Sequence, residues 1–121
     1  MTNAVLSIRD LTVEIPTRHG VLRPVNGVSY DIAPGEVLGV VGESGAGKSM
    51  AGNAVIGLLN PPAHIAGGEI HVNGARIDKL TGEAMRRLRG IEIGMELQDP
   101  LTSLNPLLRI GDQLTETMLA H

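Results

Sequence analysis

The stretch Gly42-Glu43-Ser44-Gly45-Ala46-Gly47-Lys48-Ser49 fits the pattern G-x-x-x-x-G-K-[ST] of a phosphate-binding loop. Its glycines let the backbone curl around a phosphate with the N–H groups pointing inward, where side chains would block close approach. Lys48 supplies a compact cation for β- and γ-phosphates, and Ser49 supplies a hydroxyl for Mg²⁺. A helix that begins here would add its positive N-terminal end. The stretch therefore predicts a phosphate and Mg²⁺ site.

The flanking segments have the order that such a loop requires. Residues 36–41 are a short apolar run with β-branched members, which predicts a buried parallel strand. Residues 50–59 suit a helix, and Asn60-Pro61-Pro62 is expected to end it. The alternative interpretation is a Gly-rich strand-to-helix turn that holds no ligand. The candidate nucleotide-binding residues are Gly42, Glu43, Ser44, Gly45, Ala46, Gly47, Lys48, Ser49 and Met50.

The composition limits the class of protein. With 121 residues, 42% of them hydrophobic, the chain is long enough for one small domain with a core. Tyr30 is the only aromatic residue, so the core is expected to consist of Val, Ile, Leu and Met. A single aromatic side chain also makes stacking on nucleic-acid bases unfavourable as a binding mode. The net charge is −3, and the one basic cluster, Arg86-Arg87 with Arg89, suits a solvated helix face. We therefore expect no nucleic-acid partner.

Metal, disulfide and membrane signals are weak. Cysteine is absent, which excludes a thiolate metal site and fits the cytosol. The first ten residues lack a signal-peptide pattern, and the apolar runs are too short to span a bilayer, so a membrane role is expected to act through a partner. The histidines have no ligand-like spacing and are expected in loops or on the surface. They are His19, His64, His71 and His121.

The N-terminal segments predict antiparallel strands. Residues 4–15 alternate well enough for a strand, and residues 25–32 suit the next one. Residues 16–24 are polar and punctuated by turn residues, with a hairpin turn expected at His19-Gly20. Ala33-Pro34-Gly35 suits a turn, and Ala66-Gly67-Gly68 a flexible loop. Residues 69–74 suit a strand that ends at a turn.

The later segments add two helices and one strand. Thr81 is expected to cap a helix that runs to Arg89. Residues 91–97 alternate between apolar residues and Glu or Gly, which predicts a one-sided strand. Leu114 and Met118, one helical turn apart, predict a final amphipathic helix that stops at His121. The predicted fold class is α/β, with an antiparallel β portion near the N-terminus.

Two stretches, taken together, resemble the nucleotide-binding subunit of an ABC transporter. The first is Val25-Asn26-Gly27-Val28-Ser29-Tyr30-Asp31-Ile32 with Pro34-Gly35-Glu36 and the glycine-rich loop at 42–49. The second is Gln98-Asp99-Pro100-Leu101-Thr102-Ser103-Leu104-Asn105-Pro106, which is similar to the Q-loop of the dipeptide/oligopeptide and nickel importer branch. The similarity runs from about Val5 to Met118. It implies a P-loop NTPase core of the ABC ATPase type behind an N-terminal antiparallel β portion. Residues 1–121 would be the N-terminal part of that nucleotide-binding domain, with the P-loop at 42–49 and the Q-loop at 98–106.

The resemblance also implies roles and partners. The glycine-rich loop would bind the phosphates of ATP, Ser49 would contact Mg²⁺, and Gln98 would contact Mg²⁺ or the attacking water. This makes Gln98 the candidate catalytic residue, and the loop after it would meet a membrane subunit. The implied partners are the transmembrane permease subunits of an importer and a second ATP-binding subunit. The implied place is the cytoplasmic face of the inner or plasma membrane, and the implied function is coupling of ATP binding and hydrolysis to uptake of peptides or similar solutes.

Three departures from the family pattern qualify this expectation. The Ser-Gly-Gly-Gln signature, the acidic strand with its Mg²⁺-binding Asp and general-base Glu, and the switch His do not occur, so an incomplete domain is expected. Glu96 stands where the family is usually apolar, and burial of an unpaired carboxylate would cost several kcal/mol. No aromatic residue stands before the loop at the place where many ABC ATPases stack adenine, so Leu22 or Val25 is expected to pack on the base.

Two alternatives remain from other classes of protein. One is a nucleotide-binding module that does not turn over, including an incomplete gene product. The other is a soluble ABC ATPase that acts on nucleic acid or ribosomes. The stretch 98–106 and the net negative charge argue against this alternative.

Overall fold

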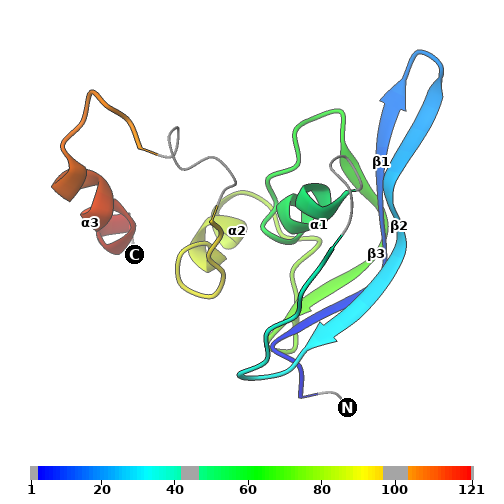
Figure 1. The fold of residues 1–121 in the computed structure, drawn as a ribbon, viewed down its shortest axis with the longest axis horizontal. Coiled ribbons are helices and arrows are strands. Elements are labelled where there is room, and N and C mark those ends of the chain that lie inside the picture. The colour runs from blue at the N-terminus through cyan, green and yellow to red at the C-terminus, as the bar shows by residue number, and fades with distance from the viewer. Residues whose placement is uncertain (1–2, 42–46, 97–103, 121) are drawn as a thin grey trace. The chain divides into compact units, whose positions relative to one another are not determined.

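The computed structural model describes residues 3–41, 47–96 and 104–120. The chain divides into two compact units, Met1–Thr81 and Gly82–His121. The first unit holds strands β1 (Leu6–Thr17), β2 (Gly20–Ile32), β3 (His64–Val72) and β4 (Ala75–Arg76) together with helix α1 (Lys48–Val55). The second holds helices α2 (Gly82–Leu88) and α3 (Ile110–Ala120) (Figure 1).

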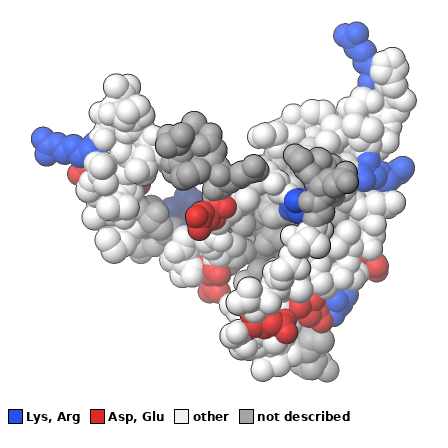
Figure 2. Space-filling view, in the orientation of Figure 1, with Lys and Arg blue, Asp and Glu red and all other residues white. Residues whose placement is uncertain are grey.

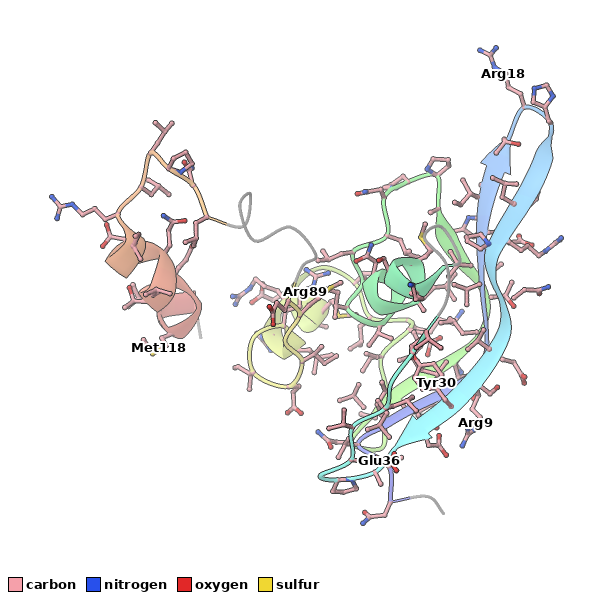
Figure 3. The ribbon with its side chains drawn as sticks, in the orientation of Figure 1. Arg9, Arg18, Tyr30, Glu36, Arg89 and Met118 are labelled. Carbon is pink, nitrogen blue, oxygen red and sulfur yellow. The ribbon has the colours of Figure 1, made fainter. Side chains whose placement is uncertain are left out.

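The strands of the first unit form one antiparallel sheet in the order β2-β1-β3-β4. This confirms the predicted antiparallel portion. The turn between β1 and β2 lies at Arg18-His19, one residue earlier than expected, and Arg18 lies at the tip of the hairpin (Figure 3).

Most of residues 16–24 are strand, although this segment is polar and contains two prolines. Both prolines are tolerated here. Pro16 pairs with Val21 of β2, beyond the point where β3 accompanies β1, and Pro24 lies on β2, the edge strand of the sheet. At such positions a missing N–H need not break the ladder.

A β-bulge interrupts β1 and turns its two halves toward the same core. Ile8, Leu11 and Val13 are all fully buried, although simple alternation would put Ile8 and Leu11 on opposite faces. The register with both β2 and β3 shifts between these residues, and Asp10 has a positive φ of 49°. The Asp10 N–H donates to Ser29 Oγ at 2.8 Å, so the extra residue is held by the neighbouring strand.

Gly68 belongs to β3, not to the flexible loop that the sequence predicted. Its φ is +92°, and a Cβ added there would overlap the backbone oxygens of Arg9 and Asp10. The glycine is therefore needed where β3 passes the bulge of β1. A pair of glycines suggested a loop, but here they permit close strand approach.

Helix α1 covers the sheet and closes the core of the first unit (Figure 1). It contacts β1, β2 and β3, and buries Ala54 and Val55. The helix ends earlier than predicted, because Gly57 adopts a left-handed φ of 71°. The Leu58 N–H bonds to Asn53 O at 2.8 Å and the Gly57 N–H to Ala54 O at 3.2 Å, which is a Schellman termination. The prolines after Asn60 are not what stops it.

Residues 36–41 do not form the predicted strand. Val37 and Val41 are 93% and 95% exposed. An apolar run becomes a buried parallel strand only when other strands flank it, and within the described residues no strand pairs with this segment. The preceding turn is as predicted: Gly35 has a φ of 75°, and the Glu36 N–H donates to Ala33 O at 3.0 Å.

The second unit consists of short helices and turns. Helix α2 begins directly after Thr81, as predicted, and Arg86 on its exposed side pairs with Glu83 at 2.6 Å. The strand predicted from residue 91 is absent from residues 91–96, where turns and one isolated bridge between Arg89 and Ile93 occur. The Ile93 N–H instead donates to Leu88 O at 3.2 Å, which folds this segment back on the end of α2.

The final helix, α3, confirms the prediction from Leu114 and Met118 (Figure 3). Both side chains are exposed, so the described residues leave the apolar positions of α3 largely uncovered. Among the described residues, no helix is long and apolar enough to cross a bilayer.

Candidate functional site

The candidate phosphate site is described from Gly47 onward. Gly47 is the N-cap of α1 with a φ of 91°, a conformation that side chains disfavour. A Cβ at this position would overlap the carbonyl oxygen of Pro24, so the loop can end here against β2 only as glycine. The remaining predicted loop residues, 42–46, lie outside the described part of the chain.

The first turn of α1 presents the chemistry that the pattern predicts. Lys48 and Ser49 open the helix and are exposed, and Met50 is half-buried behind them. The first backbone hydrogen bond of the helix runs from Ala51 N–H to Gly47 O at 2.9 Å, so the amides of Ser49 and Met50 have no acceptor within the helix. No acidic residue lies in this turn. The helix therefore offers a positive end, a cation and a hydroxyl together.

The two residues proposed to pack on adenine differ in their surroundings. Val25 is only 3% exposed and lies against Gly47, so its side chain belongs to the core, which makes it unsuitable as a stacking surface. Leu22, further along the hairpin, is 58% exposed. Of the two, only Leu22 presents apolar surface to a ligand.

The described part of the chain gives no second metal centre. No group of three or more His, Cys, Asp or Glu residues within it is placed to hold a metal ion. His19 and His64 are exposed and His71 is half-exposed, while His121 lies outside the described residues. Glu96 is exposed and outside any strand, so the cost of burying its carboxylate does not arise.

Gln98, predicted to be catalytic and to contact Mg²⁺, lies outside the described residues, as do residues 99–103. The end of the predicted Q-loop is described, and Leu104, Asn105 and Pro106 are exposed. This end is tied to α3 by the amide side chain of Gln113, at 2.7 Å from Asn105 N–H. Gln113 was not predicted, because a single polar residue near a helix start has many possible partners.

Asp78, just after β4, is a charged residue held by several partners. The Asp78 side chain is 2% exposed, accepts the Ile70 N–H at 3.0 Å and pairs with Arg76 Nε at 3.0 Å. Burial raises the pKa of Asp78, but the hydrogen bonds from Arg76 and Ile70 outweigh it, so this pKa lies below its ordinary value. Asp78 and Arg76 therefore form an ion pair that stabilises the fold. The face drawn in Figure 2 carries both acidic and basic side chains.

Comparison with protein families matches residues 25–120 to the ABC transporter family. The chain belongs to this family. It is 43% identical over 118 residues to the dipeptide transport ATP-binding protein DppD of Bacillus subtilis, covering 97% of this chain and 35% of that protein. It is 42% identical over 119 residues to the oligopeptide transport ATP-binding protein OppD of Escherichia coli, covering 98% of this chain and 35% of that protein. The chain thus spans about a third of the length of these curated relatives.

The family assignment accounts for the main sequence features of this ABC transporter chain. Its matched region begins at Val25 on β2 and includes both α1 and α3. It therefore contains the glycine-rich loop and the stretch 98–106 that carried the resemblance. The peptide-transport names of the relatives agree with the importer branch that this second stretch suggested.

Proposed function

We propose that this chain is the ATP-binding portion of an ABC importer that couples ATP binding and hydrolysis to uptake of peptides or similar solutes. One observation carries the proposal. Lys48 and Ser49 open α1 in the exposed positions that the phosphate-loop pattern requires, behind a glycine that cannot carry a side chain. The relatives are named dipeptide and oligopeptide transport ATP-binding proteins, which supports the peptide class.

In this proposal residues 42–50 bind ATP and Mg²⁺. The Lys48 ammonium attracts the β- and γ-phosphates, and backbone N–H groups of the first turn of α1 donate to phosphate oxygens. Mg²⁺ would be held by the Ser49 hydroxyl and contacted by Gln98. Gln98 would also orient the attacking water, since a neutral amide can donate and accept without adding charge. When bound, the metal would neutralise charge that develops on the phosphates.

The proposed domain is the N-terminal part of an ABC nucleotide-binding domain, with its P-loop at 42–49 and its Q-loop at 98–106. Residues 36–41 would join a P-loop NTPase core as a parallel strand when other strands flank them. Their exposed valines support this, because such apolar surface is stabilised by burial at about 25 cal/mol per Å².

The proposed partners are the permease subunits of the importer and a second ATP-binding subunit. The protein would then lie peripherally at the cytoplasmic face of the membrane, held there by the permease. We propose no nucleic-acid partner, because the net charge of −3 opposes phosphate-backbone binding.

Titration with a fluorescent ATP analogue tests the phosphate site. At about 4 Å, an ammonium and a phosphate charge attract by roughly 4 kcal/mol at an effective dielectric of 20, and exposure of Lys48 to solvent reduces this. We expect Lys48→Ala to weaken binding at least about tenfold, which corresponds to about 1.4 kcal/mol. Lys79→Ala is the matched control, since Lys79 is the only other lysine and lies exposed in a turn. Equal affinities of the wild-type protein and Lys48→Ala would refute the assignment.

A further inference from the structure

The loop that leads into α3 is wrapped around one side chain, that of Gln113. Its Oε1 accepts the Asn105 N–H at 2.7 Å. Its Nε2 donates to Asn105 O at 2.9 Å and to Leu108 O at 3.1 Å, with Arg109 O a more distant third acceptor at 3.4 Å. One amide thus binds both backbone groups of Asn105 and the carbonyls that precede the helix. We call this arrangement, Gln113 with residues 105–109, the Gln113 clasp.

The turn inside the clasp is reinforced by its own residues. Asn105 Oδ1 accepts the Leu107 N–H at 2.9 Å, and the Leu108 N–H donates to Asn105 O at 3.2 Å. Asn105 therefore holds the turn locally, while Gln113 fastens that turn to the first turns of α3. Gln113 itself is anchored by its backbone N–H, which donates to Arg109 O at 3.2 Å.

Only an amide of this length satisfies both ends of the clasp. The Oε1 faces a donor and the Nε2 faces carbonyl oxygens, so the amide has one correct orientation. A glutamate at this position would bring a carboxylate oxygen against Asn105 O and Leu108 O, where acceptors would face acceptors. A methionine would fill the space without making any of the bonds.

We propose that Gln113 is a positioning residue that fixes the end of the stretch 98–106 to α3, so that a displacement of this stretch is passed on to the helix. The inference rests on the proposed function, in which nucleotide state acts on Gln98. Leu104, Asn105 and Pro106 are the last three residues of that stretch, and Asn105 is the residue that the clasp holds. A rigid link is what a two-state element needs in order to transmit a change between its ends.

The test measures coupling in the full-length transporter that contains this chain, reconstituted in vesicles. The wild-type protein, Gln113→Met, Gln113→Glu and the control Glu116→Gln, an exposed change on α3, are compared for ATP-analogue affinity, ATPase rate and solute uptake. We expect Gln113→Met and Gln113→Glu to leave ATP affinity within about twofold and to lower solute moved per ATP hydrolysed at least about fivefold. Loss of one hydrogen bond of ordinary net strength, about 1 kcal/mol, corresponds to roughly fivefold, and each Gln113 variant loses at least two. Glu116→Gln should retain the wild-type ratio.

The ratio separates a positioning role from simple loss of folded protein. Fewer folded molecules would lower uptake and ATPase rate in proportion and leave their ratio unchanged, and this result would overturn the inference. A fall of the same size in Glu116→Gln would also overturn it, because the effect would not belong to the clasp. If the wild-type protein bound no ATP, the proposed function would fall and the coupling role with it. If the wild-type protein bound ATP and both Gln113 variants kept its ratio, only the positioning role would fall.

Discussion

Replacing Asp78 is expected to destabilise the unit Met1–Thr81 through loss of one buried acceptor. Asp78 lies just after β4, and its carboxylate accepts the N–H of Ile70, a fully buried residue of β3. The carboxylate also accepts hydrogen bonds from Arg76 Nε at 3.0 Å and from a terminal Arg76 nitrogen at 3.1 Å. In Asp78→Ala the Ile70 N–H loses its acceptor in a buried place.

The expected magnitude follows from these contacts. An unsatisfied buried N–H costs about 1–3 kcal/mol. The Arg76 pair adds little, because its guanidinium is 41% exposed and keeps Glu69 as a partner at 2.7 Å. We therefore expect Asp78→Ala to lower the free energy of unfolding by about 2 kcal/mol. Asp78→Asn retains an oxygen for the Ile70 N–H but sets an N–H₂ group against Arg76. We expect it to lower the free energy of unfolding by about 1 kcal/mol.

The pH dependence has a definite sign. The pKa of Asp78 is lowered in the folded protein, so the carboxylate contributes stability above its unfolded pKa and loses that contribution as the pH falls through the folded pKa. The difference in unfolding free energy between the wild-type protein and Asp78→Asn should stay constant between about pH 7 and pH 5. It should close progressively below about pH 4.

Urea unfolding followed by tyrosine fluorescence measures this unit selectively. Tyr30 is the only aromatic residue and lies on β2, in the same unit as Asp78. With a slope of about 1–2 kcal/mol per molar urea, the midpoint of Asp78→Ala should fall by about 1–2 M. Lys79→Ala, an exposed change in the same turn, serves as control and should stay near the wild-type midpoint. A wild-type midpoint for Asp78→Ala would refute the reasoning, as would a gap for Asp78→Asn that does not narrow as the pH falls below about 4.

Two further predictions concern the bulge and the coupling loop. Gly68→Ala should lower the free energy of unfolding by about 2 kcal/mol or more, because its Cβ would overlap backbone atoms of Asp10. The control Gly67→Ala, where a Cβ meets nothing within 4 Å, should lower it by less than about 1 kcal/mol. Equal losses in the two variants would contradict the close approach of β3 to the bulge. In the full-length transporter, Gln98→Ala should spare most ATP binding but impair ATPase rate and uptake, whereas Leu104→Ala should impair mainly uptake; normal uptake with Gln98→Ala would remove the coupling role.

The sequence predicted the elements whose cause is local. The strand at β1, the turn after Ile32 and the helix α3 follow from alternation, turn residues and helical spacing, which neighbouring residues largely determine. The bulge at Asp10 also left a signal, because the apolar positions change from Leu6 and Ile8 to Leu11 and Val13 at that point. Over residues 4–15 as a whole, the pattern nevertheless predicts plain alternation.

The sequence could not predict what depends on distant partners. Residues 36–41 have the composition of a buried strand, but burial requires flanking strands that the described residues do not supply. The role of Gly68 depends on the backbone of Arg9 and Asp10, some sixty residues earlier, and the clasp of Gln113 depends on a turn whose shape no periodicity encodes. The start of α1 was predicted correctly, because the residues of a glycine-rich loop before a helix determine that start locally.

The most direct test of the account is an NMR titration of the protein with Mg·ATP that follows the backbone amide signals. The account predicts that the amides of Gly47, Ser49 and Met50 shift first and saturate together, because they lie at the start of α1, while the amide of His19 at the hairpin turn does not move. The same shifts should be lost in Lys48→Ala at equal nucleotide concentration. Unchanged amides at the start of α1 under saturating Mg·ATP, or shifts that survive Lys48→Ala undiminished, would contradict the claim that this turn binds the phosphates.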